Sequence, residues 1–80
     1  MKFIVGGRMI DLERQDVIDG LQGKTPPVHA RQRLFVSVNR KAWPVKAALC
    51  EATGLDKIAF PSAEAVRVLG KLGFPTSRRD

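Results

Sequence analysis

The residues suited to nucleophilic or acid–base chemistry are scarce in this chain. His29 is the only histidine and Cys50 the only cysteine. A nucleophilic cysteine needs a neighbouring base, but Cys50 lies in a segment with helical apolar spacing, where a lone cysteine usually packs as a small hydrophobe. Asp16 and Asp19 stand three residues apart without the further oxygen ligands that a metal ion requires. We therefore expect no enzyme activity, no metal ion and no cofactor.

Cations are the other distinctive residues. The 80-residue chain has 14 Lys and Arg against 8 Asp and Glu, which gives a formal net charge of +6. Not one acidic residue stands between Asp19 and Glu51, and the carboxyl-terminal tail is also basic. Charge segregated in this way is typical of a polyanion-binding face. The alternative is a solvated surface that net charge keeps soluble.

The candidate nucleic-acid contacts come from the acid-free interval, the last predicted helix and the tail. Cations beside an indole suit phosphate contact and stacking, and a helix N-terminus near Lys46 would attract phosphate. Core packing remains the alternative for Trp43, as does a solvated turn for Arg40 and Lys41. The full set is Arg31, Arg33, Arg40, Lys41, Trp43, Lys46, Ser62, Arg67, Lys71, Arg78 and Arg79.

The first part of the chain predicts a hairpin, a helix and a restricted loop. Residues 2–10 read as a β-hairpin whose Gly6-Gly7 turn supplies positive φ at both positions. Asp11 is placed to cap a helix that runs to about Gln22. Residues 24–30 contain two consecutive prolines and predict a loop with a restricted backbone.

The second part predicts a second hairpin and two helices. Residues 33–38 form the clearest strand, followed by a polar turn and a short return strand at 42–43. Apolar residues at helical spacing predict a helix over 44–53, with proline at its first position. An extended piece is predicted at 58–60, and Ser62 is placed to cap a last helix that ends near residue 72.

These elements predict an α+β fold, in which two small hairpins form a short antiparallel sheet packed with three short helices. We expect one basic domain over residues 1–74 and a basic flexible tail at 75–80. The last two helices outline a helix-turn-helix-like pair, although their connector of residues 54–61 is longer than the usual three or four. The alternative is an ordinary helix packed on a sheet. A chain of this length buries only about 60% of its unfolded surface, which leaves little room for a deep active site.

Targeting signals are missing from the sequence. The amino-terminal apolar run is too short for a signal-peptide core, and the longest aliphatic run, residues 47–50, cannot span a bilayer. A single cysteine fits a reducing compartment. We expect a cytoplasmic protein with no membrane partner, associated with the nucleoid if it binds DNA.

Short motifs in residues 33–74 resemble a small bacterial domain. A strand ends in aromatic-Pro-x-Lys, a helix ends in Thr-Gly, Phe and Ser follow, and a last helix closes with Leu-Gly-Phe. Versions stand alone as small proteins, and a related one resembles the N-terminal head domain of some modification-dependent HNH restriction endonucleases. The resemblance carries over, mostly as structural positions, Trp43, Pro44, Lys46, Ser62, Leu72, Gly73 and Phe74.

The resemblance implies association with DNA, in defence or gene regulation. This chain departs from the head-domain pattern in two places. Trp43-Pro44-Val45-Lys46 stands where Tyr-Pro-Pro-Lys is usual, and Phe60-Pro61-Ser62-Ala63 stands where Phe-Ser-Gly-Gly is usual. We expect no nuclease domain after this one, so any restriction role would need a partner, and recognition of modified bases does not transfer.

Two functional hypotheses follow. The first is a largely sequence-tolerant module that binds double-stranded DNA through phosphates, in gene regulation, chromosome organisation or defence, with RNA left open. The second is an adaptor or inhibitor that docks a basic face on an acidic protein. Edge strands of the small sheet could also pair two copies into a homodimer.

Overall fold

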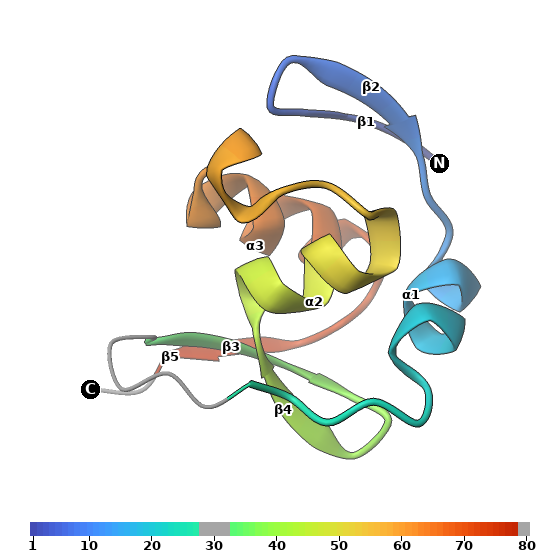
Figure 1. Ribbon diagram of the computed structural model, residues 1–80, viewed down its shortest axis with the longest axis vertical. Coiled ribbons are helices and arrows are strands. Elements are labelled where there is room, and N and C mark those ends of the chain that lie inside the picture. The colour runs from blue at the N-terminus through green and yellow to red at the C-terminus, as the bar shows by residue number, and fades with distance from the viewer. Residues whose placement is uncertain (28–32, 79–80) are drawn as a thin grey trace.

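The computed structural model describes residues 1–27 and 33–78. These residues form three α-helices and two small antiparallel sheets, which confirms the predicted α+β class (Figure 1). The three-stranded sheet lies along one side of the molecule, and helices α2 and α3 lie over it. The two-stranded hairpin lies beyond α3, and α1 stands at the side (Figure 1). The expectation that the two hairpins form a single sheet was wrong. The first hairpin packs on α3, and it pairs with neither strand of the second hairpin.

The first hairpin consists of β1 (Lys2–Val5) and β2 (Arg8–Asp11). Its turn is Gly6-Gly7, and both residues have positive φ, 57° and 78°. Gly6 is also close to another part of the chain, since a Cβ there would lie 2.0 Å from the Ala59 carbonyl oxygen. Glycine at position 6 therefore serves both the turn and a backbone contact with the connector between α2 and α3.

Helix α1 (Arg14–Leu21) begins later than the sequence predicted. Strand β2 continues through Asp11, so the expected cap at that residue was wrong. Glu13 is the N-cap instead, and its backbone N–H donates to the Asp16 carboxylate at 2.8 Å in a capping box. This box satisfies helix N–H groups that would otherwise lack partners.

The second sheet contains β3 (Leu34–Val38), β4 (Lys41–Pro44) and β5 (Thr76–Arg78), in the order β4-β3-β5. The expectation of a flexible tail at 75–80 was therefore wrong for residues 76–78, which form an edge strand on β3. In the β3–β4 turn, Asn39 and Arg40 have positive φ, 54° and 65°. Two such residues give the twist that a two-residue hairpin needs.

Helices α2 (Val45–Thr53) and α3 (Ser62–Lys71) are joined through the short 3₁₀ helix η1 (Lys57–Ala59). The extended piece expected at 58–60 was wrong for the first two of these residues, because the Asp56 carboxylate accepts from the Ile58 N–H and caps a helical turn. Ser62 is the first residue of α3 rather than its cap, and Pro61 occupies the N-cap position without a side-chain hydrogen bond.

The core lies between the three-stranded sheet and the helices. The inward residues of β3 and β4 meet the apolar faces of α2 and α3, and burial of this area is the main stabilising contribution. Its largest fully buried members are Trp43, Leu21, Leu49 and Leu69. None of the helices in the described part of the chain is long and apolar enough to cross a membrane.

Candidate nucleic-acid interface

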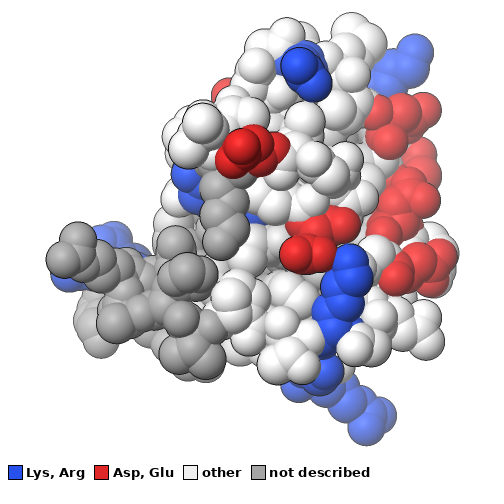
Figure 2. Space-filling model, viewed as in Figure 1, with Lys and Arg blue, Asp and Glu red and all other residues white. Residues whose placement is uncertain are grey.

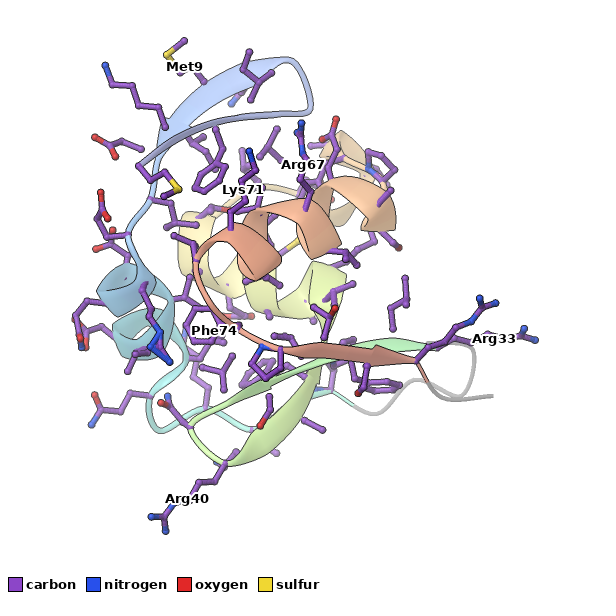
Figure 3. All side chains as sticks on the ribbon, turned by 180° about the vertical axis from the view of Figure 1, so that it is seen from behind. Met9, Arg33, Arg40, Arg67, Lys71 and Phe74 are labelled. Atoms are coloured by element: carbon purple, nitrogen blue, oxygen red, sulfur yellow. The ribbon has the colours of Figure 1, made fainter. Side chains whose placement is uncertain are left out.

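The three-stranded sheet carries cations at both ends and no carboxylate in any of its strands. Arg33 precedes β3, and the β3–β5 register places Arg78 opposite Leu34, beside Arg33. Both arginines are exposed, and Figure 3 shows Arg33 projecting from this end of the sheet. The fold thus places a cation of the central segment and one of the carboxyl-terminal segment at the same end of the sheet.

The other end of the sheet is the β3–β4 turn. Arg40 is exposed at its tip and points away from the molecule (Figure 3). The Asn39 side-chain amide donates to the Ile18 carbonyl oxygen at 3.0 Å, so α1 holds this turn in place. Lys41 is engaged within the chain, since its Nζ donates to the Lys24 carbonyl oxygen at 2.9 Å. Arg40 is therefore better placed than Lys41 to reach a ligand.

The acidic residues of β2 and α1 lie on a different edge, where Figure 2 shows the red side chains gathered. The Met1 ammonium contacts the carboxylates of Asp11, at 3.0 Å, and Glu13. The hydrogen bonds that the ammonium donates to Glu13 and Asp11 raise the pKa of the amino terminus above its ordinary value. Asp16 belongs to the helix cap and Asp19 accepts from the Gln15 amide. These carboxylates therefore serve local structure at the amino terminus and in α1.

Lys24 and Lys46 are cations of the central segment that have intramolecular partners. Lys24 Nζ lies 2.8 Å from a Glu51 carboxylate oxygen. The Lys46 ammonium lies 5.8 Å from the centroid of the Phe60 ring, a cation–π contact. The N-terminus of α2 is also shielded, because Pro44 and Val45 are fully buried. The phosphate site predicted at this helix end is therefore obstructed.

Trp43 is a core residue. Its side chain is 1% exposed and lies on the face of β4 that packs against the helices. The indole cannot stack on a base at the surface in this conformation, so core packing is the alternative that the structure shows. Its Nε1 is buried and has no hydrogen-bond partner in the structure.

The predicted residues of α3 lie apart from the sheet. Arg67 Nη2 donates to the Ile4 carbonyl oxygen at 3.1 Å, and Glu64 accepts from the Gly6 N–H at 3.0 Å. Figure 3 shows Arg67 and Lys71 on the side of α3 that faces the first hairpin. Ser62 is half-buried at the start of the helix. The structure thus does not unite this group with the cations of the sheet, and Arg31 and Arg79 lie outside the described residues.

Arg14 is a cation that sequence reasoning missed. Its guanidinium lies 4.8 Å from the centroid of Phe74, just before β5. Arg14 stands among acidic residues in the sequence, so the charge pattern did not indicate it as a candidate contact. An isolated basic residue three positions before the first buried apolar residue of its helix gives no signal that it will reach a distant aromatic ring.

Comparison with known proteins finds no relative of this chain. No protein-family model matches the chain, and neither the curated proteins nor the solved structures contain a match.

Proposed function

We propose that this chain is a small nucleic-acid-binding module that holds the phosphates of duplex DNA with the two cationic ends of its three-stranded sheet. The observation that carries the proposal is the sheet itself: exposed arginines at both ends and no acidic residue in any strand. The carboxylates of β2 and α1, which would repel a polyanion, lie on another edge (Figure 2).

The spacing of the two ends supports contact across a groove. Strand β3 separates Arg33 from the turn that carries Arg40, a span of roughly 20 Å at about 3.4 Å per residue. The B-DNA major groove is about 12 Å wide, and arginine side chains can reach the phosphates on either side. Phosphate contacts position a protein without reading sequence, so binding is largely sequence-tolerant.

Duplex DNA suits the site better than an unpaired strand. Proteins that hold single strands stack bases on exposed aromatic side chains, whereas Trp43 is buried and Phe35 is half-buried. In a cell, such a module would act in the cytoplasm and associate with the nucleoid, in gene regulation, chromosome organisation or defence.

A salt-titrated binding curve tests this function. Fluorescence anisotropy with a labelled 20-base-pair duplex measures the dissociation constant at several salt concentrations. Contacts from Arg33, Arg40 and Arg78 predict that the logarithm of the association constant falls with log salt, with a slope whose magnitude is about 3 or more. A single strand and a structured RNA of equal length serve as competitors. Binding that does not respond to salt would contradict the proposal.

A second candidate function is a protein-interaction module, and one observation favours it. Ile4 and Met9 are direct cross-strand partners on the outer face of the first hairpin, 58% and 68% exposed. Adjacent exposed apolar side chains often mark a protein contact. A protein of this kind would bind an acidic partner, or a second copy of itself, at defined stoichiometry and show no DNA binding at physiological salt.

A further inference from the structure

Strand β2 is the open edge of the first hairpin. The Leu12 N–H donates to the Met1 carbonyl oxygen at 2.8 Å. Because hydrogen-bonded and non-hydrogen-bonded pairs alternate along an antiparallel ladder, the backbone N–H and C=O groups of Met9 and Asp11 point away from β1. No other strand of the described residues pairs with this edge. Strand β2 therefore presents backbone hydrogen-bonding groups to an additional strand.

The opposite edge of the hairpin is covered by α3. The Ile4 carbonyl oxygen accepts from Arg67 at 3.1 Å, and the Gly6 N–H donates to Glu64 at 3.0 Å. Figure 1 shows β1 next to α3 and β2 at one end of the longest axis of the molecule, opposite the three-stranded sheet. Figure 3 shows Met9 projecting from that end. An additional strand can therefore reach β2 without displacing another element.

The charges of β2 are complementary to those of an antiparallel copy of the same strand. The strand begins with Arg8 and ends with Asp11, and both residues are exposed. Two antiparallel copies of β2 bring Arg8 of each copy alongside Asp11 of the other, whereas opposite charges on neighbouring strands stabilise a sheet and like charges destabilise it. A uniformly basic or acidic peptide would meet a like charge at one end of β2. The strand thus matches a second copy of itself better than such a peptide.

The exposed apolar side chains of the hairpin favour one register for this pairing. Ile4 and Met9 are cross-strand partners on the outer face, 58% and 68% exposed. With Met9 of the two copies opposite each other, their outward N–H and C=O groups bond reciprocally. The four apolar side chains then form one row across four strands, and part of their surface is removed from water. A Lys2–Asp11 pair lies on each side of that row.

The net charge of +6 on each copy does not oppose this contact. The exposed arginines of the three-stranded sheet, Arg33, Arg40 and Arg78, lie toward the other end of a molecule 30 Å long (Figure 1). The Debye length is about 8 Å at physiological ionic strength, so repulsion between the two sheets is screened.

We infer that two copies of this chain associate through antiparallel pairing of their β2 strands, with Met9 opposite Met9. Four residues from each copy form a contact smaller than a standard interface, so the association is weak, with a dissociation constant on the order of 100 µM. The dimer carries its three-stranded sheets at opposite ends and can hold two DNA duplexes at once. Only this bridging rests on the proposed function.

Analytical ultracentrifugation without DNA, from about 10 µM to about 1 mM chain, measures the association. We expect the apparent mass to rise toward twice that of one chain. Met9→Pro removes the outward N–H, leaves the ladder bonds of Arg8 and Ile10 to β1 in place, and should abolish association. The matched variant Met9→Thr keeps the N–H and a strand-forming residue, and should weaken association by less than about tenfold.

A mixing experiment tests the antiparallel charge match without a proline. Arg8→Glu places like charges at both ends of the β2 pair, and so does Asp11→Lys, so each variant alone should associate at least about fivefold more weakly than the wild type. In an equimolar mixture, opposite charges meet again at both ends, and association should return.

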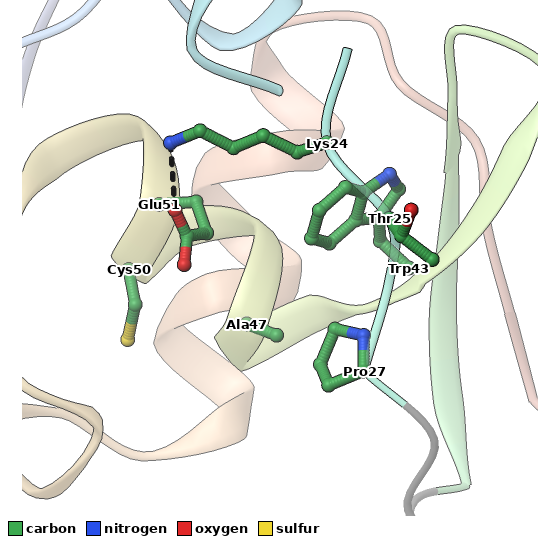
Figure 4. A pocket seen from close by; sticks show the side chains of 7 residues that line it. All are labelled: Lys24, Thr25, Pro27, Trp43, Ala47, Cys50 and Glu51. Carbon is green, nitrogen blue, oxygen red and sulfur yellow. Dashed lines mark hydrogen bonds and ion pairs between the residues drawn. The ribbon is translucent and has the colours of Figure 1, made fainter. Parts of the chain in front are cut away.

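The control for this mixture is an ion pair within one chain. Lys24 Nζ lies 2.8 Å from a Glu51 carboxylate oxygen, and the pair joins α2 to the segment that follows α1 (Figure 4). Lys24→Glu and Glu51→Lys make the same kinds of charge change outside β2. Alone or mixed, these two variants should associate as the wild type does.

Three results would overturn the inference. The first is a chain that remains monomeric at about 1 mM, and the second is unchanged association of folded Met9→Pro. The third is a mixture of Arg8→Glu and Asp11→Lys that associates no better than either variant alone. A dimer that does not bind DNA would instead contradict the proposed function. The bridging is supported if an immobilised duplex retains a second, labelled duplex through the wild-type chain and not through Met9→Pro, and is contradicted if a DNA-binding dimer retains none.

Discussion

Arg78 lies opposite Leu34 in the register of β5 on β3, so this carboxyl-terminal arginine stands beside Arg33 at one end of the sheet. The two are far apart in the sequence, and only the pairing of β5 unites them. The same pairing sets this group apart from Arg67 and Lys71, which lie near the first hairpin (Figure 3). The cations of residues 1–27 and 33–78 therefore divide into groups whose contributions can be separated by mutation.

The first prediction uses that division. Replacing Arg33 and Arg78 together by alanine should weaken duplex DNA binding and reduce the magnitude of the salt slope by about 2, since each lost phosphate contact contributes about 0.9. Replacing Arg67 and Lys71 by alanine removes the same charge from the hairpin side and should change the slope by less than half as much. Anisotropy titrations measure both. Equal losses in the two double variants would mean that only net charge matters.

The second prediction concerns the close contact between Gly6 and Ala59. Alanine at either turn glycine forces a side chain into positive φ, which costs about 1–2 kcal/mol. At Gly6 the new Cβ would also lie 2.0 Å from the Ala59 carbonyl oxygen, whereas at Gly7 nothing lies within 4 Å. Urea denaturation should therefore show Gly6→Ala to be less stable than Gly7→Ala by at least about 1 kcal/mol. Similar losses in both variants would show that the hairpin moves away from the connector freely.

The helices and the two hairpins were predictable because each has a local signal. The Gly6-Gly7 turn, the alternation of β3 and the apolar period of α2 are properties of adjacent residues, and all three elements are present in the structure. Strand β5 was not predictable in this way. Its three residues, Thr-Ser-Arg, have weak strand character, and their conformation depends on pairing with the distant edge of β3.

The candidate site was predicted only in part, because side-chain partners are set by tertiary structure. Sequence spacing placed Arg67 correctly on a helix, and it set Lys41 in the turn that the structure ends one residue earlier, with Lys41 as the first residue of β4. It could not show that their cationic groups donate to the carbonyl oxygens of Lys24 and Ile4. The sequence also left both alternatives open for Trp43, and its burial depends on which face of β4 packs against the helices.

A third prediction concerns the amino terminus. The contacts with Glu13 and Asp11 raise the pKa of the Met1 ammonium above 8.0. A group whose pKa is raised by folding stabilises the native state below its unfolded pKa, and this stabilisation is lost as the pH rises through the folded pKa. We expect the free energy of unfolding to fall between about pH 8 and the raised pKa, less steeply in the Asp11→Asn, Glu13→Gln double variant. Urea titrations across that range, with the wild-type chain in parallel, provide the measurement.

A fourth prediction addresses the turn that presents Arg40. Asn39 adopts positive φ and donates from its side chain to the Ile18 carbonyl oxygen. Asn39→Gly keeps the favourable turn geometry and loses only the hydrogen bond, so it should lower the free energy of unfolding by at most about 1.5 kcal/mol. Asn39→Ala loses the bond and adds the strain of positive φ, and should cost about 1 kcal/mol more. If the two variants unfold at the same urea concentration, the turn has relaxed to another geometry.

The last prediction separates the core role of Trp43 from a role in binding. Trp43→Phe keeps an aromatic ring in the core, removes the unpartnered Nε1 donor and leaves every exposed arginine in place. We expect duplex DNA affinity and its salt slope to remain within about twofold of the wild type. Trp43→Ala should destabilise the fold by about 3–5 kcal/mol, which urea denaturation measures. Because stacking on a base contributes about 1–3 kcal/mol, a contact made by the indole would instead appear as a loss of roughly five- to 150-fold in the affinity of fully folded Trp43→Phe. That loss would mean that β4 opens on binding and exposes the indole to the nucleic acid.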